Sequence, residues 1–501
     1  MAERRTNAWI ASPILWITAG AALLRLVDLT ARSLWFDEAV SMLIARSDLA
    51  GAVRAADAEK LPPLYNLVLH LFLVVFRGEA AARVLSVLAG AATVPVVYRI
   101  GVRLSGKTAG LVAAGLLALS PFHLWYSQEI RMYALQTLLA SISCLAMLRL
   151  LDGDAERRDR AGVALYAVAT ALALYAQYTS LFLVVFQDAF FLAAWKRHRA
   201  AWKRWLAAQV AAGALFLPWL PRFFAHFLAR TGDFWLPDLS AAYLLSHFAN
   251  FAGGLQSRTA LNPALAWVGL LGCVACAALV LARKEDRAAG AFLAAWFFVP
   301  TVALAATSLG RNIFLSRSLL FTVPPYCLLV ALATRPFLSR SWKLAPGLAL
   351  LGVFFAGSGY GVFHYFADPN WWIRPPHREI AERLARICQD GDLIVHVSRF
   401  TYRPYQFYQR GRCAAGLIRE TEDTPGLFRV IGDSGLPQDT SAVKRIWLVA
   451  YDDFQQPREA RKIAGWMNRF HVRKEVLLAD RLNFVALYER KDPRVAPPIE
   501  P

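Results

Sequence analysis

The sequence predicts an α-helical polytopic membrane protein that ends in a small α/β domain. Three observations support this fold class: 57% of the residues are hydrophobic, nearly uncharged apolar runs recur up to Gly361, and the character of the chain changes after residue 366. Soluble domains carry about a quarter charged residues, against 18% here. Each apolar run approaches the roughly 20 residues that a helix needs to cross a bilayer.

The distribution of basic residues predicts the topology. Lys and Arg cluster in some of the loops between apolar runs, and the positive-inside rule places these loops in the cytoplasm. The pattern is consistent with about eleven spans, provided that the short segment 62–76 lies along the outer surface as an interfacial helix. We therefore expect a transmembrane domain over residues 1–366, with a first outer loop at about 30–83, and an extracytoplasmic α/β domain over residues 367–501.

The formal net charge of +19 limits the possible partners. The charge lies mostly in short loops beside apolar runs and in the tail, which favours the lipid bilayer and anionic lipid substrates over nucleic acid. The chain has only six cysteines, too few for a disulfide scaffold. Cys388 and Cys413 lie in the tail and can form a disulfide if the tail is outside the cytoplasm.

The tail has the pattern of a mixed domain. Residues 376–388 have helical periodicity, and residues 392–397, 445–450 and 484–488 are rich in β-branched and aromatic side chains. This pattern predicts one helix and three strands.

The first outer loop contains two adjacent carboxylates, Asp37 and Glu38, directly after two aromatic residues. A carboxylate at this boundary can act as a general base that deprotonates an acceptor hydroxyl or amine. A donor with a lipid phosphate as leaving group needs no second acid, unlike an ordinary glycoside. The alternative is that the acid pair caps a helix over residues 39–46.

A second polar cluster lies between two spans, on the same predicted outer side. Glu129, Arg131 and Tyr133 alternate, so an extended segment would point them one way. Arg131 can hold a phosphate through its fork of donors, and Glu129 can orient it. The aromatic residues of the cluster also fit an interfacial belt. His123 is interpreted as structural, because it has no metal-binding companions nearby.

Basic residues on the predicted outer side form a third group. Arg311 and Arg317 lie in a short outer turn, and Lys60 precedes paired prolines. Lone basic residues outside run against the positive-inside trend, which favours phosphate binding. Snorkelling to the interface is the alternative.

These residues resemble a known family. The segments SLWFDEA, PPLYNLVLHL, SPFHLWYSQEIRMYAL and FLSRSLLFTVPPYCLLVALA, in this order, are similar to family 39-type bacterial glycosyltransferases of the GT-C fold, which are related to protein O-mannosyltransferases and lipid A aminoarabinose transferase. The resemblance covers nearly the whole chain.

The resemblance implies inverting transfer of a sugar from a polyprenyl-phosphate donor, at the outer face of the plasma membrane, to a lipid, glycan or protein acceptor of the cell envelope. It implies that Asp37, with its neighbour Glu38, is catalytic and that the donor site is lined by Gln128, Glu129, Arg131, Tyr133 and Arg317. Two departures are visible: Lys60 is displaced by one residue from the family's Glu-Lys-Pro-Pro, and Ser318 replaces its Tyr. No metal motif is present and relatives with this donor type generally depend on none, so no cofactor is expected.

A lipid-linked sugar flippase is the alternative from another functional class. Such a transporter predicts charges at mid-membrane and internal repeats. The polar groups here concentrate at one predicted face instead, which favours the enzyme.

Overall fold

The computed structural model describes residues 12–152, 156–228, 236, 238–253, 262–310, 312–338, 344–368, 375–421, 424–432, 443–451, 462, 463, 465, 467–469, 471–479 and 483–491. The chain divides into two compact units. The helical unit comprises Met1–Leu29 and Ile44–Ile373, and the C-terminal unit comprises Thr30–Leu43 and Arg374–Pro501. Part of the first outer loop is therefore grouped with the tail.

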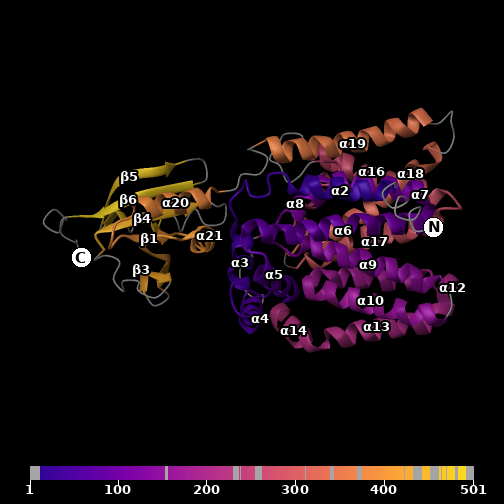
Figure 1. The fold of residues 1–501 in the computed structure, drawn as a ribbon, viewed down its shortest axis with the longest axis horizontal. Coiled ribbons are helices and arrows are strands. Elements are labelled where there is room, and N and C mark those ends of the chain that lie inside the picture. The colour runs from indigo at the N-terminus through magenta and orange to yellow at the C-terminus, as the bar shows by residue number, and fades with distance from the viewer. Residues whose placement is uncertain are drawn as a thin grey trace, which may run out of the picture. The chain divides into compact units, whose positions relative to one another are not determined.

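The helical unit is built from long apolar helices, several of which lie side by side (Figure 1). Its principal helices are α2 (Pro13–Leu26), α4 (Leu49–Ala58), α5 (Leu64–Val75), α6 (Glu79–Ser105), α7 (Lys107–Leu119), α8 (Pro121–Ser127), α9 (Tyr133–Leu151), α10 (Glu156–Ala176), α11 (Leu181–Ala193), α12 (Trp195–His198), α13 (Trp202–Phe216), α14 (Leu220–Leu228), α15 (Ala241–Ala249), α16 (Asn262–Ala282), α17 (Arg287–Thr307), α18 (Val323–Leu338) and α19 (Leu344–Ala367). Short 3-10 helices η1 (Tyr178–Ser180) and η4 (Ser316–Thr322) join some of them.

Many of these helices are suited to a membrane. Among the described residues, six helices are long and apolar enough to cross a bilayer, and the bent pair α7–α8 makes a seventh if it is one span. Four shorter apolar helices accompany them, including α2 and α5. The predicted polytopic helical fold is confirmed, although this range of counts does not establish the expected eleven spans.

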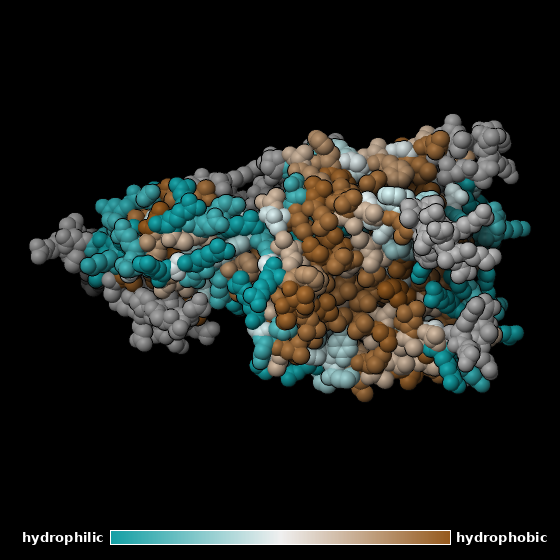
Figure 2. Space-filling model, viewed as in Figure 1, coloured by the Kyte–Doolittle hydropathy of each residue, from teal (hydrophilic) through white to brown (hydrophobic). Residues whose placement is uncertain are grey.

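The surface of the helical unit is apolar, as lipid contact requires. Figure 2 shows a broad band of hydrophobic residues over this unit, with hydrophilic residues near α12. Leu23, Val210 and Leu271 are at least 60% exposed. Exposing each such side chain to water would cost about 1.5–3 kcal/mol, whereas contact with lipid tails carries no such cost. The chain is therefore a multi-pass membrane protein.

The C-terminal unit is a six-stranded mixed sheet in the order β3-β2-β1-β4-β6-β5. The strands are β1 (Leu393–His396), β2 (Ala414–Thr421), β3 (Thr424–Gly432), β4 (Arg445–Tyr451), β5 (His471–Ala479) and β6 (Asn483–Arg490), and the helices are α20 (His377–Ile387) and α21 (Arg399–Tyr408). β1 runs parallel to β2 and β4, and the other neighbours pair antiparallel.

Alternation along the strands builds two apolar layers in this unit. Leu393 and Val395 of β1 belong to one buried cluster, while Ile394 packs with Ile380 and Leu384 of α20 on the other face. A strand alternates its side chains between faces, so both faces of the sheet are covered. The predicted helix and three strands are confirmed as α20, β1, β4 and β6.

Candidate active site

Asp37 and Glu38 lie in the first turn of α3 (Phe36–Ala45), a helix that begins in the C-terminal unit. The helix starts three residues earlier than the sequence pattern predicts, so both acids are inside it. Glu38 is fully buried, and its Oε2 accepts a hydrogen bond from the amide of Trp35 at 3.4 Å. This is the reciprocal half of a capping box.

The two acids therefore differ in environment. The helix-capping alternative applies to Glu38, whose carboxylate serves the backbone at the start of α3. Asp37 is only half-buried, and its backbone oxygen accepts from Ser41 Oγ at 3.1 Å, as in an ordinary helical turn. Asp37 is thus the better candidate for chemistry on a substrate, and its catalytic role stays a prediction.

The second motif lies in the helical unit at a break in a span. Helices α7 and α8 are bent by 60°, with Pro121 at the start of α8 and Ser120 Oγ accepting from the His123 amide at 3.4 Å. Residues 129–133 do not form the extended segment that would point Glu129, Arg131 and Tyr133 one way. The backbone turns instead, with the Arg131 amide donating to the Glu129 carbonyl at 2.8 Å, and Tyr133 opens α9.

This turn joins α8 to α9. Its side chains are buried: Glu129 is 1% exposed and Arg131 is 6% exposed. Trp125 Nε1 donates to Glu129 Oε1 at 2.7 Å, so the carboxylate is anchored by an aromatic residue of the same motif. A carboxylate held in place in this way can orient a neighbouring cation or a sugar hydroxyl.

Gln128 holds the motif to other helices. Its Nε2 donates to the carbonyls of Arg25 and Val27 at 2.9 and 2.8 Å, and its Oε1 accepts from Tyr365 Oη at 2.7 Å. Because the amide is used in these three bonds, Gln128 braces the motif. Its predicted contact with the donor stays a prediction.

The structure brings Arg317 to the second motif. Arg317 lies in η4, and its guanidinium is 5.9 Å from the centroid of the Tyr133 ring. Tyr126 packs edge-on against the same ring at 5.2 Å. A guanidinium over an aromatic face is held by cation–π attraction, which here keeps a fixed positive charge at Tyr133, the last residue of the second motif.

Lys60 lies at the end of α4 in a left-handed conformation, with φ of 57°. The Lys60 amide donates to the Asp57 carbonyl at 2.9 Å, and the Leu61 amide donates to the Ala56 carbonyl at 2.9 Å. These bonds resemble the usual termination of a helix by a left-handed residue. A lysine in this conformation is uncommon, so its surroundings must hold it there. Arg311 lies outside the described residues.

A network of side-chain hydrogen bonds that the sequence analysis missed, here called the relay, holds this end of α4. Asp57 Oδ1 is 2.9 Å from His226 Nε2, and Asp57 Oδ2 is 3.1 Å from Arg222 Nη1. Since His226 Nε2 donates to the carboxylate, its Nδ1 accepts from Tyr178 Oη at 2.8 Å, and Tyr178 in turn accepts from Trp219 Nε1 at 2.9 Å. No local sequence pattern links these residues.

The relay borders a cavity of about 160 Å³ in the helical unit. The wall is mostly apolar, with polar groups at Gln177, Thr179 and Ser318. Thr179 Oγ1 donates to the Ser318 carbonyl at 2.9 Å, which connects η1 to η4 next to Arg317 in the chain. The remaining lining residues are Tyr178, Leu181, Phe182, Phe223, His226, Phe227, Ile313 and Leu315.

His123 is structural, as predicted. Its Nδ1 is 2.9 Å from Nη2 of Arg25, a fully buried arginine whose Nη1 also donates to the Ala118 carbonyl at 3.0 Å. Since Arg25 donates, the imidazole is the acceptor in this pair. Arg25 was missed because it stands alone in an apolar run.

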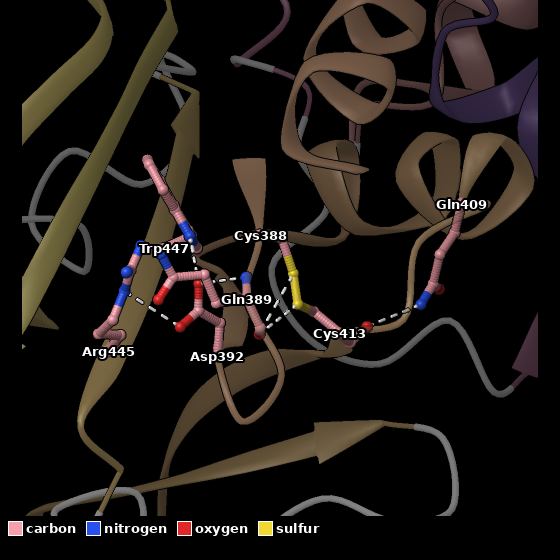
Figure 3. Close-up of a disulfide and its surroundings, with 7 residues drawn as sticks. All are labelled: Cys388, Gln389, Asp392, Gln409, Cys413, Arg445 and Trp447. Carbon is pink, nitrogen blue, oxygen red and sulfur yellow. Dashed lines mark hydrogen bonds and ion pairs between the residues drawn. A yellow bond between two sulfur atoms is a disulfide. The ribbon is translucent and has the colours of Figure 1, made fainter. Parts of the chain in front are cut away.

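Within the described residues, one group of side chains could bind a metal ion. It lies in the C-terminal unit and consists of Cys388, Asp392 and Cys413. The two cysteines form a disulfide (Figure 3). Asp392 Oδ1 is 3.1 Å from Arg445 Nε, and its Oδ2 accepts from Trp447 Nε1 at 3.0 Å. These potential metal ligands are therefore already engaged in bonds that stabilise the C-terminal unit.

Comparisons with known proteins show what the chain is similar to. Residues 60–221 match the model of the dolichyl-phosphate-mannose-protein mannosyltransferase family. No curated protein sequence matches the chain.

Solved structures share the fold over almost the whole chain. ArnT from Cupriavidus metallidurans in the apo state is 14% identical with a TM-score of 0.65, covering 96% of this chain and 98% of that one. The same protein bound to undecaprenyl phosphate gives a TM-score of 0.61 at 14% identity, with the same coverage. Archaeal oligosaccharyltransferase AglB from Archaeoglobus fulgidus, in complex with an inhibitory peptide and a dolichol-phosphate, is 12% identical with a TM-score of 0.57, covering 92% of this chain and 72% of that one.

The resemblance to family 39-type enzymes that the motifs indicate is thereby confirmed. The chain shares the GT-C fold of these solved structures, and the match over residues 60–221 together with this fold indicates a multi-pass membrane glycosyltransferase.

Proposed function

We propose that this enzyme transfers a sugar from a polyprenyl-phosphate donor to a lipid, glycan or protein acceptor, with inversion, at the outer face of the plasma membrane. The observation that carries the proposal is the fold shared over 96% of the chain with ArnT, which has been solved with undecaprenyl phosphate bound. The family whose model matches residues 60–221 is itself named for a dolichyl-phosphate sugar donor.

The proposed chemistry gives different roles to the carboxylate and to the arginines. Asp37 takes the proton from the acceptor hydroxyl or amine as that atom bonds to the anomeric carbon. The bond from the anomeric carbon to the phosphate oxygen breaks on the opposite side, and polyprenyl phosphate leaves. Arg131 and Arg317 stabilise the negative charge that builds on the leaving oxygen, since preorganised cations in a water-poor site act strongly on developing charge.

The disulfide supports the proposed sidedness. Cys388 and Cys413 are bonded in the C-terminal unit, and structural disulfides persist outside the reducing cytoplasm. The other four cysteines are free and buried in the helical unit. An impermeant thiol reagent, applied to intact cells after reduction, should label Cys388 and Cys413. Labelling only after the cells are opened would place this unit in the cytoplasm and overturn the sidedness.

The catalytic proposal is tested with Asp37→Asn, matched by Glu38→Gln at the neighbouring capping residue. Membranes that carry each variant in a deletion strain are extracted, and polyprenyl-phosphate sugars are measured by mass spectrometry. We expect one donor species to accumulate in the deletion strain and with Asp37→Asn, and its mass gives the sugar class. Full turnover by Asp37→Asn at normal expression would refute the role of this residue as base.

A further inference from the structure

We infer that α20 and α21 of the C-terminal unit, here called the clamp, position the catalytic carboxylate by binding the residues that precede it. The inference rests on the proposed function, because it takes Asp37 as the base. The residues that the clamp binds, 30–36, are here called the entry segment. They belong to the same compact unit as α20 and α21, although the tail follows them only after the whole helical unit.

The first contact is at Ser33, which is 4% exposed. Its Oγ donates to Glu379 Oε2 at 2.9 Å and accepts from the Arg378 amide at 3.2 Å. Both partners lie in the first turn of α20, where backbone amides have no partner within the helix. Ser33 therefore acts from a distant part of the chain as a cap for α20.

The second contact holds the backbone of Leu34, which is fully buried. Its amide donates to Tyr408 Oη at 2.8 Å, at the last residue of α21. The guanidinium of Arg378 lies 5.5 Å from the centroid of the Tyr408 ring, and its Nη1 donates to the Thr30 carbonyl at 3.2 Å. One arginine thus connects the entry segment with both helices of the clamp.

The third contact is at Phe36, the residue immediately before Asp37. Its ring centroid is 4.8 Å from that of Phe400, in the first turn of α21. Aromatic pairs at this separation contribute about 0.5–1.5 kcal/mol beyond the area that they bury. The ring pair sets the direction in which α3 leaves the entry segment.

These contacts matter because Asp37 stands in the first turn of α3. The orientation of that turn is set by the residues that enter it, and a displacement of about 1 Å at a catalytic group can reduce the rate about 100-fold. The clamp is itself rigid, because Ile380 and Leu384 of α20 and Tyr405 of α21 pack in the buried cluster that covers the sheet. Glu379, Tyr408 and Phe400 are therefore positioning residues.

The test uses the full-length enzyme and compares Glu379→Ala and Tyr408→Phe with a matched control, Glu382→Ala. Glu382 is also on α20 and is half-exposed, and its Oε2 lies 3.9 Å from Nη2 of Arg386 on the same helix. Steady-state transfer is measured against a polyprenyl-phosphate sugar, and hydrogen exchange is measured on peptides that cover residues 30–43.

We expect each clamp variant to reduce kcat about three- to tenfold, the effect of one lost hydrogen bond, with the donor KM unchanged. Exchange of the Leu34 amide should accelerate with Tyr408→Phe and stay normal with Glu382→Ala. Glu379→Gln keeps an acceptor for Ser33 and should restore most of kcat, which a loss of folding would not allow.

Unchanged kcat in the double variant Glu379→Ala, Tyr408→Phe, with an intact fold by exchange elsewhere in the unit, would overturn the clamp. If Asp37→Asn is inactive in the same assay, that result removes only the clamp and leaves the proposed function standing. If Asp37→Asn is active, the base assignment falls, and with it the reason for a clamp.

Discussion

Removing the disulfide of the C-terminal unit should loosen the sheet to which α20 and α21 are attached. Cys388 directly follows the last residue of α20, and Cys413 precedes β2 (Figure 3). The bridge closes a loop with a sequence separation of 25. Loop-closure entropy for this length corresponds to about 3.5 kcal/mol of stability. For a unit of this size, the loss should lower the melting temperature by roughly 10 °C.

The perturbation is the double variant Cys388→Ser, Cys413→Ser in the full-length enzyme. Unfolding is followed during heating in detergent by pulsed hydrogen exchange of peptides that cover β1 and α20, so that the C-terminal unit is observed separately from the helical unit. A reductant should lower the melting temperature of the natural chain to that of the variant and leave the variant unchanged. Identical melting temperatures for both proteins, with no effect of reductant, would refute the existence of a stabilising bridge.

Three further predictions concern pH, the donor phosphate and the second motif. Burial lowers the pKa of His377 and His396 in the C-terminal unit to about 3. In the unfolded chain both histidines are protonated below about pH 6.5. The free energy of unfolding should therefore fall from pH 6.5 towards pH 3, by up to about 1.4 kcal/mol per pH unit for each histidine. The double variant His377→Gln, His396→Gln should lose stability less steeply over this pH range, and an equally steep loss would contradict the assignment to these histidines. Arg317→Lys keeps the charge but loses the planar contact with Tyr133. The KM for the donor should therefore rise roughly tenfold. An unchanged KM for both Arg317→Lys and Arg317→Gln would exclude phosphate binding by Arg317. Gln128→Leu leaves buried polar partners unsatisfied and should destabilise the helical unit by about 2–4 kcal/mol in denaturant titrations, whereas an unchanged midpoint would show that these bonds contribute nothing.

Local patterns in the sequence predict much of the architecture. Apolar runs identify the spanning helices because a helix in lipid must be apolar along its length. Short apolar runs rich in β-branched and aromatic residues identify β1, β4 and β6, which are buried on both faces of the sheet. β2, β3 and β5 were missed. Charges in β5 (HVRKEVLLA) and Pro and Gly in β3 (TPGLFRVIG) mask the strand pattern.

The motif residues were found from their chemistry, but their conformation was not. Residues 129–133 alternate in the sequence as a strand would, and yet they turn, because α8 ends at Ser127 and α9 begins at Tyr133. The capping of α3 by Glu38 likewise depends on where the helix starts. Helix boundaries respond to tertiary packing, which a short pattern does not contain.

The sequence by itself determined that this protein lies in a membrane and that a mixed domain follows the helices, and it predicts that the chemistry depends on carboxylates and arginines beside aromatic residues. Only the tertiary structure decided which of these groups meet. Arg317 on Tyr133, His226 on Asp57, and the entry segment on α20 and α21 join residues far apart in the chain. Such contacts follow from the packing of whole elements, and single hydrogen bonds or ring contacts across that distance leave no periodic trace in the sequence.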